Sequence, residues 1–184
     1  VITATGGELG TLGTGGIKIR REDLASVRES ELKANMSTYG ANPPFMLRYM
    51  DQELEKEDPE VLAIKILDIM HTVEPDVVST FGPSGISNHP DHIAIHKSTL
   101  IAYKKYHNPT SENSPILIYP SIPEDIAKMY NLQLSSVEKK MDLLIDIDDT
   151  IRYKIEGLKN YKSQEDAQEF AARLSEMEGP HFES

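Results

Sequence analysis

The stretch that decides the fold is VVSTFGPSGISNHPDHIAIH, residues 77–96, in which an apolar strand pattern passes through a glycine-containing loop into a helix. Val77 and Val78 are typical of a buried strand, and Pro90 is favoured in the first turn of a helix. The loop therefore lies at the carboxyl end of a strand, which is where open α/β sheets bind ligands.

Helical and strand patterns alternate along the rest of the chain. Apolar spacing predicts helices over residues 21–39, from Pro59 onwards, and over 89–106, 151–161 and 165–177. Strands are predicted at VITAT (1–5), FMLRYM (45–50), PDVVSTFG (75–82), PILIYP (115–120) and MDLLIDI (141–147). This alternation favours an α/β fold with a mainly parallel sheet that is covered on both faces. Gly40 is placed to end the first of these helices. Asp148 or Asp149 is placed to cap the start of the helix over residues 151–161.

Composition excludes several classes of protein. The chain has 184 residues, of which 39% are hydrophobic and 27% charged, so we expect one compact globular domain. The net charge of −11 repels nucleic acid, and no apolar run is long enough to span a bilayer. The chain has no cysteine, which agrees with the cytoplasm and means that any metal must be held by histidine and carboxylate.

Three of the six histidines, His89, His92 and His96, are spaced three and four residues apart and can share one helical face. Neutral imidazole is a good zinc ligand, and a catalytic zinc takes about three protein ligands and one water. Asp91 would orient either neighbouring histidine by accepting its second ring N–H, or would only be a favourable charge in the first helical turn. We expect His96 to be packed or exposed to solvent.

Several motifs occur in one order along nearly the whole chain: VITATGGELG (1–10), VRESELKANMSTYG (27–40), YMDQEL (49–54), TFGPSGISNHPDH (80–92), YKIEGLKNYKSQ (153–164) and GPHFE (179–183). They resemble the motifs of the LmbE-like zinc deacetylases. That family includes the N-acetylglucosaminyl-phosphatidylinositol de-N-acetylase and the deacetylases of mycothiol and bacillithiol synthesis.

The resemblance implies a Rossmann-like three-layer sandwich over residues 1–184, and a Zn²⁺-dependent hydrolase that removes acetyl from an N-acetylated amino sugar or related small molecule. It implies that His92 is a zinc ligand and that His89, supported by Asp91, is the polarising or acid residue beside the metal. Arg28 and Asp51 align with residues that face the sugar substrate. For Arg28, an exposed helix charge paired with a nearby glutamate is the alternative.

The chain departs from the family pattern in one respect that affects activity. The A-H-P-D-D-E motif, which carries the other zinc ligands and the general base, does not occur in these 184 residues. One imidazole cannot hold a catalytic zinc alone. We therefore expect the N-terminal strand and helix of the domain to be missing from this chain. The alternative is a catalytically inactive sugar- or partner-binding protein that retains the fold.

Two further departures concern single positions. Tyr161 stands where the family pattern has a histidine, and Gly6 and Gly7 stand where many members have a charged residue before a glycine. A third interpretation, an unrelated α/β protein whose HPDH segment is a helix cap, fits the ordered motifs least well. The oligomeric state is open, and a homo-oligomer is one alternative because related proteins are often multimers.

Overall fold

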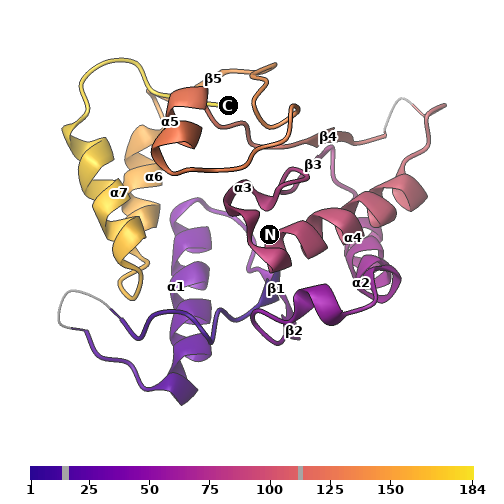
Figure 1. The fold of residues 1–184 in the computed structure, drawn as a ribbon, viewed down its shortest axis with the longest axis horizontal. Coiled ribbons are helices and arrows are strands. Elements are labelled where there is room, and N and C mark those ends of the chain that lie inside the picture. The colour runs from indigo at the N-terminus through magenta and orange to yellow at the C-terminus, as the bar shows by residue number, and fades with distance from the viewer. Residues whose placement is uncertain (14–16, 112–113) are drawn as a thin grey trace. The chain divides into compact units, whose positions relative to one another are not determined.

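Figure 1 shows the protein as a computed structural model, which describes residues 1–13, 17–111 and 114–184. The chain divides into two compact units. The first comprises Val1–Asp51 and Ile145–Glu183, and the second comprises Gln52–Leu144 with Ser184. Each unit contains its own parallel pair of strands, which agrees with the α/β class predicted from the sequence.

In the first unit, strand β1 (Ile2–Thr5) pairs in parallel with β2 (Phe45–Tyr49). A short antiparallel pair joins β5 (Ile145–Asp146) to β6 (Phe182–Glu183). The helices of this unit are the 3-10 turn η1 (Arg21–Asp23), α1 (Leu24–Thr38), α6 (Ile151–Lys159) and α7 (Glu165–Glu176). Helix α6 packs between α1 and α7, as Figure 1 shows at its left.

Helix α1 ends where the sequence predicts. Gly40 has a φ of 64°, and the N–H of Ala41 reaches back to the carbonyl of Met36 at 2.9 Å, which is a glycine-terminated helix end. On its buried face, Glu31 accepts the backbone N–H of Ser163 at 2.7 Å and the Ser163 hydroxyl at 2.6 Å. Two sequence motifs far apart in the chain are thereby joined in one contact.

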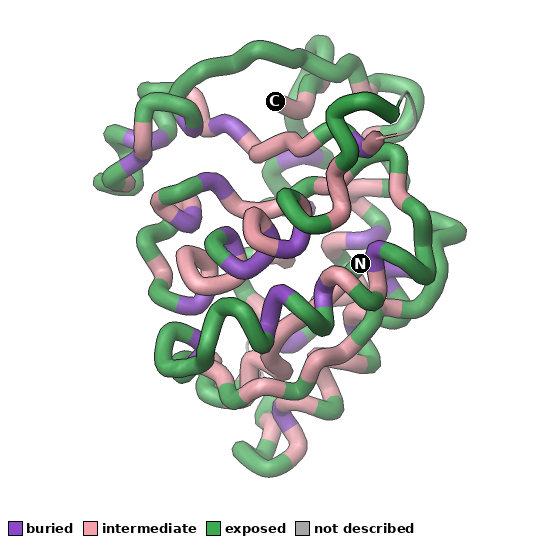
Figure 2. Tube along the Cα trace, turned by 90° about the vertical axis from the view of Figure 1, so that its right-hand side faces the viewer, coloured by how far each residue is buried: buried purple, intermediate pink, exposed green. Residues whose placement is uncertain are grey.

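In the second unit, strand β3 (Val77–Ser79) pairs in parallel with β4 (Ile116–Ile118). The helices of this unit are the 3-10 turn η2 (Leu54–Lys56), α2 (Pro59–Val73), α3 (Gly85–Asn88), α4 (Pro90–Tyr106) and α5 (Glu124–Met129). Helices α2 and α4 pack together, and the apolar core of α2 consists of Leu62, Ala63, Ile66 and Met70. Figure 2 shows such buried segments in purple, alternating with exposed ones in green.

Two predictions about local structure are wrong. The MDLLIDI segment forms a strand only at Ile145–Asp146, in an antiparallel pair, and Leu144 is 55% exposed. The N-cap of α6 is Thr150, not Asp148 or Asp149. The reason is that the Asp148 carboxylate accepts the backbone N–H and the ring Nδ1–H of His181, at 2.7 and 2.8 Å.

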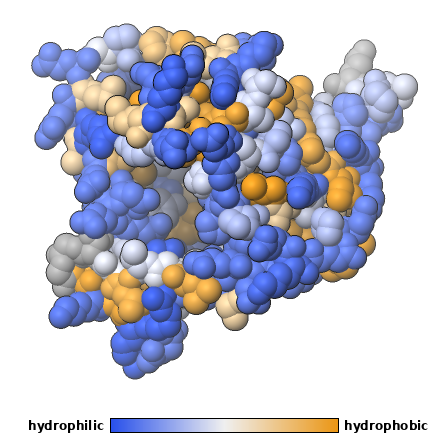
Figure 3. Space-filling model, in the orientation of Figure 1, coloured by the Kyte–Doolittle hydropathy of each residue, from blue (hydrophilic) through white to orange (hydrophobic). Residues whose placement is uncertain are grey.

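The face drawn in Figure 3 is largely polar. Figure 3 shows hydrophilic side chains in blue over much of one face, with hydrophobic groups in orange between them. This distribution fits a chain with a net charge of −11. In the part of the chain that the structure describes, no helix is both long and apolar enough to cross a membrane.

Candidate functional site

His89 is the N-cap residue of α4, with an extended backbone at φ −67° and ψ 129°. Its ring Nδ1 lies 3.2 Å from the backbone nitrogen of Asp91 and accepts that N–H. An imidazole nitrogen that accepts a hydrogen bond carries no proton, so the neutral ring has its proton on Nε2. His89 therefore presents Nε2–H as a hydrogen-bond donor.

His92, one turn further along α4, has the opposite arrangement. Its Nδ1 lies 3.0 Å from the carbonyl oxygen of Gly85 and 3.3 Å from the hydroxyl of Ser87. Because a carbonyl oxygen only accepts, Nδ1 carries the proton and the lone pair of the ring is on Nε2. A second hydrogen bond of this kind is what orients a metal-binding histidine in many proteins.

The two imidazoles lie next to one another. The centroids of the His89 and His92 rings are 5.0 Å apart. The Phe81 ring stacks on the His92 ring, with a centroid distance of 4.0 Å and an interplanar angle of 5°. The site thus combines a ring whose Nε2 donates with a ring whose Nε2 can bind a metal. Such a pair can polarise a carbonyl group and stabilise the negative charge that develops on its oxygen.

Asp91 is placed differently from the expectation that it orients a histidine. Its side chain is buried, with 6% of the residue exposed, and its two carboxylate oxygens accept the backbone N–H groups of Gln52 at 2.8 Å and Leu54 at 3.0 Å. Only the backbone N–H of Asp91 contacts His89. The carboxylate therefore ties the start of α4 to the turn at residues 52–54.

His96 is packed, which is one of the two states expected from the sequence. It is 5% exposed, its Nδ1 lies 2.7 Å from the carbonyl oxygen of Phe81, and its ring lies 5.5 Å from that of Tyr119. These contacts anchor α4 to the strand segment before the loop.

Arg28 and Asp51 belong to the first unit, and both contact the loop that follows β1. A Cβ added at Gly7 or Gly10 would lie 2.5 or 2.4 Å from the Arg28 guanidinium, so any larger residue there would make this side chain move. The Asp51 carboxylate accepts the N–H of Leu9 at 3.0 Å. Among the described residues, Arg28 forms no ion pair and its buried Nε has no hydrogen-bond partner.

Metal ligands are incomplete in the described part of the chain. Within residues 1–13, 17–111 and 114–184, no group of three or more histidine and carboxylate side chains is arranged to hold a metal ion. His92 fits as one ligand by its ring tautomer. The described residues do not form a zinc site by themselves.

One buried residue beside this site was missed by the sequence analysis. Glu138 is fully buried and accepts hydrogen bonds from Ser84, which lies in the loop before His89. Ser135 and Glu138 have the S-x-x-E spacing of a capping box, a local signal that would have paired them. No sequence signal connects either residue with Ser84.

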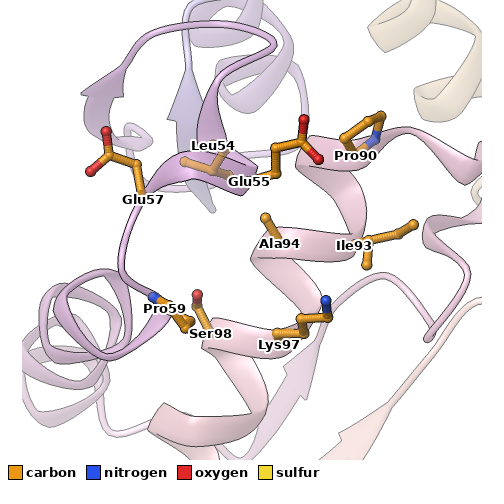
Figure 4. Close-up of a pocket in the computed structure, with 9 residues that line it drawn as sticks. All are labelled: Leu54, Glu55, Glu57, Pro59, Pro90, Ile93, Ala94, Lys97 and Ser98. Atoms are coloured by element: carbon orange, nitrogen blue, oxygen red, sulfur yellow. The ribbon is translucent and has the colours of Figure 1, made fainter.

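A pocket of about 360 Å³ lies along the first half of α4 (Figure 4). Residues from η2 and the segment before α2 face residues of α4 across it. Its lining residues are Leu54, Glu55, Glu57, Pro59, Pro90, Ile93, Ala94, Lys97 and Ser98. The lining includes neither histidine of the pair, so this pocket is separate from the paired imidazoles.

Comparison with known proteins identifies related sequences and folds. A relative from Bacillus cereus, a probable N-acetyl-alpha-D-glucosaminyl L-malate deacetylase 2, is 27% identical over 170 residues that cover 90% of this chain and 71% of the relative. The structure of N,N'-diacetylchitobiose deacetylase from Pyrococcus horikoshii has a TM-score of 0.63 at 18% identity. That match covers 94% of this chain, which spans 63% of the deacetylase.

The same fold also occurs in a protein with another activity. GalB, the 4-carboxy-2-hydroxymuconate hydratase from Pseudomonas putida, has a TM-score of 0.67 at 16% identity, and the match covers 95% of this chain and 70% of GalB. Likeness of fold therefore leaves the reaction open. The sequence model of the GlcNAc-PI de-N-acetylase (PIG-L) family matches residues 1–103, which is more than half of the chain. The chain therefore belongs to the GlcNAc-PI de-N-acetylase family, as its motifs predicted.

Proposed function

We propose that this protein is an N-deacetylase, a hydrolase that removes the acetyl group from an N-acetylated amino sugar or related small molecule. The family match and the deacetylase from Bacillus cereus support this class of reaction. The observation that carries the proposal is the pair of adjacent imidazoles with opposite tautomers, His89 and His92, at the start of α4.

The proposal includes the domain architecture. Residues 1–184 would belong to a single domain of the Rossmann-like three-layer type that lacks its N-terminal strand and helix here, and the parallel strand pairs and the deacetylase fold neighbour support this fold type. A cysteine-free chain is suited to a reducing compartment, so the cytoplasm is the location that we propose.

We propose Zn²⁺ as the cofactor, with Nε2 of His92 as the ligand that this chain contributes. A bound zinc polarises an amide carbonyl and lowers the pKa of its water to about 7. A catalytic zinc needs about three protein ligands, and the described residues supply one.

His89 would act directly on the substrate. The backbone N–H of Asp91 holds Nδ1 as an acceptor, which leaves Nε2–H to donate to the carbonyl oxygen of the acetamide. This hydrogen bond strengthens as the oxygen becomes an oxyanion, and the loss of one such donor typically lowers kcat by about 100- to 1000-fold. Asp91 supports this role by holding the start of the helix.

Arg28 and Asp51 would bind the sugar. Arg28 forms no ion pair among the described residues, so no carboxylate there neutralises its guanidinium, which can pair with a substrate hydroxyl or carboxylate. Asp51 uses Oδ2 for the N–H of Leu9, and Oδ1 remains as an acceptor for a sugar hydroxyl. Both side chains contact one loop, so the conformation of that loop would affect the binding of a ligand held by either side chain.

The test is an assay of amine release from a panel of N-acetylated amino sugars, together with metal analysis of the same preparations. We expect His89→Ala to lower kcat by about 100- to 1000-fold with its zinc content unchanged. His92→Ala should lose zinc. His71→Ala, which replaces an exposed histidine of α2, should change neither quantity. Equal zinc content in His92→Ala and the parent would exclude the ligand assignment.

A second candidate is a catalytically inactive sugar- or partner-binding protein that retains the fold. The observation that favours it is the lack of a three-ligand metal group among the described residues. Binding of an N-acetylated sugar without release of amine, at saturating zinc, would identify this function.

A further inference from the structure

Glu138 is a buried carboxylate without a cationic partner among the described residues. Its side chain is fully buried, and it accepts the N–H and hydroxyl of Ser135 at 3.0 and 2.6 Å. It also accepts the N–H of Ser84 at 3.2 Å, the hydroxyl of Ser84 at 2.5 Å and the N–H of Ile86 at 3.5 Å. A buried charge must be satisfied in this way, and here most of the donors come from one loop.

The fit between Glu138 and this loop is close. A Cβ added at Gly82 would lie 2.2 Å from Cγ and 2.5 Å from Cδ of Glu138, so only glycine admits the carboxylate at this point. Burial raises the pKa of Glu138, whereas the hydrogen bonds from Ser135 and Ser84 lower it. The hydrogen bonds together outweigh burial, so the pKa lies below its ordinary value. The group is therefore charged at neutral pH, when its hydrogen bonds are strongest.

The opposite side of the same loop contacts His92. Between Ser84 and Ile86, which bind Glu138, the carbonyl of Gly85 accepts the Nδ1–H of His92 at 3.0 Å. Gly85 has a φ of 65°, and a Cβ there would lie 2.8 Å from the Cβ of His92. Ile86 has a φ of 60°, which is strained for a branched side chain and persists only where neighbouring contacts hold it.

We infer that Glu138 is a positioning residue that fixes the loop at residues 82–86, so that the Gly85 carbonyl holds Nδ1–H of His92 and keeps the ring lone pair on Nε2. The use of that lone pair for zinc rests on the proposed function. The path from Glu138 through Ser84, Ile86 and Gly85 to the ring does not depend on it.

The direct test is the tautomer of the His92 ring in the whole chain, measured by long-range ¹H–¹⁵N NMR about two pH units above the ordinary histidine pKa of about 6.5. His92→Ala assigns the signal. The parent should show predominantly the Nδ1–H form. In Glu138→Gln the ratio of Nδ1–H to Nε2–H should fall about fivefold, which corresponds to the loss of one hydrogen bond of about 1 kcal/mol.

Two further variants make the result specific. Glu124→Gln makes the same chemical change at an exposed glutamate of α5 and should leave the ratio unchanged. Ser84→Ala removes one hydroxyl donor with little change of volume, so it decides the matter if Glu138→Gln does not fold. Its ratio should fall in the same direction, by about twofold, because one of several donors is lost.

An unchanged ratio in folded Glu138→Gln would overturn the inference, and so would an unchanged ratio in Ser84→Ala where that variant decides. A purely structural role would lower the melting temperature and leave the tautomer as it is. The measurement needs neither zinc nor turnover. A protein that lacks deacetylase activity can therefore still confirm the role of Glu138, and the two proposals fail separately.

Discussion

Replacing Asp91 with asparagine tests whether its carboxylate holds the turn at residues 52–54. In the parent, each carboxylate oxygen accepts one backbone N–H, from Gln52 and Leu54, in a buried setting. Hydrogen bonds to a charged group contribute about 1.5 to 3 kcal/mol each, and neutral ones about 1 kcal/mol. The amide of Asn keeps one weakened acceptor and turns an NH₂ group toward the other N–H. The free energy of unfolding should therefore fall by about 2 to 4 kcal/mol.

Urea denaturation followed by circular dichroism measures this loss as a lower midpoint at an unchanged slope. The matched control is Asp58→Asn, because Asp58 caps the exposed start of α2 by accepting the N–H of Glu60 at 2.9 Å. Asparagine is an equally good N-cap, so this variant should stay within about 0.5 kcal/mol of the parent. If Asp91→Asn lost only about 0.3 to 1 kcal/mol, Asp91 would be no more than a favourable charge in a first helical turn, and the reasoning from its two contacts would be refuted.

Three other substitutions have definite expected outcomes. Alanine at Gly157 would place a Cβ 2.1 Å from the hydroxyl of Tyr39, so thermal unfolding should show a loss of about 1 to 3 kcal/mol where a helical Gly→Ala change ordinarily stabilises. Ser163→Ala removes a hydroxyl from buried Glu31 and should cost about 1.5 to 3 kcal/mol, and a urea midpoint equal to that of the parent would contradict this. Because the pKa of Glu138 is lowered by folding, the carboxylate stabilises the protein above its unfolded pKa and loses this effect as the pH falls through the folded value. The difference in unfolding free energy between the parent and Glu138→Gln should therefore be largest at neutral pH and shrink in acid, and a pH-independent difference would count against a charged Glu138.

The elements that the sequence predicts correctly are those with local signals at their ends. Pro59 and Pro90 stand at the first positions of α2 and α4, and Gly40 follows α1 with a positive φ. Proline has no backbone N–H, and in the first helical turn an N–H would have no partner within the helix. Glycine has no Cβ that would disfavour a left-handed backbone. These are properties of single residues, so they can be read without knowledge of the fold.

The predictions that are wrong or missing depend on contacts between distant segments. Aspartate is a common N-cap residue, but the Asp148 carboxylate accepts the backbone N–H of His181, 33 residues further along the chain. Asp91 lies in a helical first turn, but its acceptors serve amides 37 and 39 residues earlier. Glu138 is connected to Ser84 across 54 residues. A buried carboxylate accepts hydrogen bonds from the donors that the fold brings to it. The local sequence around the carboxylate therefore does not identify those donors.

The candidate site shows the same division between local and distant information. The spacing of His89 and His92 predicts that their rings share one face of α4, and the ring centroids are 5.0 Å apart. Their tautomers depend on partners, which are a backbone N–H for His89 and the Gly85 carbonyl for His92. Since a deacetylase and a hydratase share this fold at 18% and 16% identity, architecture leaves the chemistry open. One ring that donates beside one that can bind a metal is suited to hydrolysis of an amide, whereas a binding protein needs no such difference between the two. The tautomers therefore favour the hydrolase over the binding protein more strongly than the fold does.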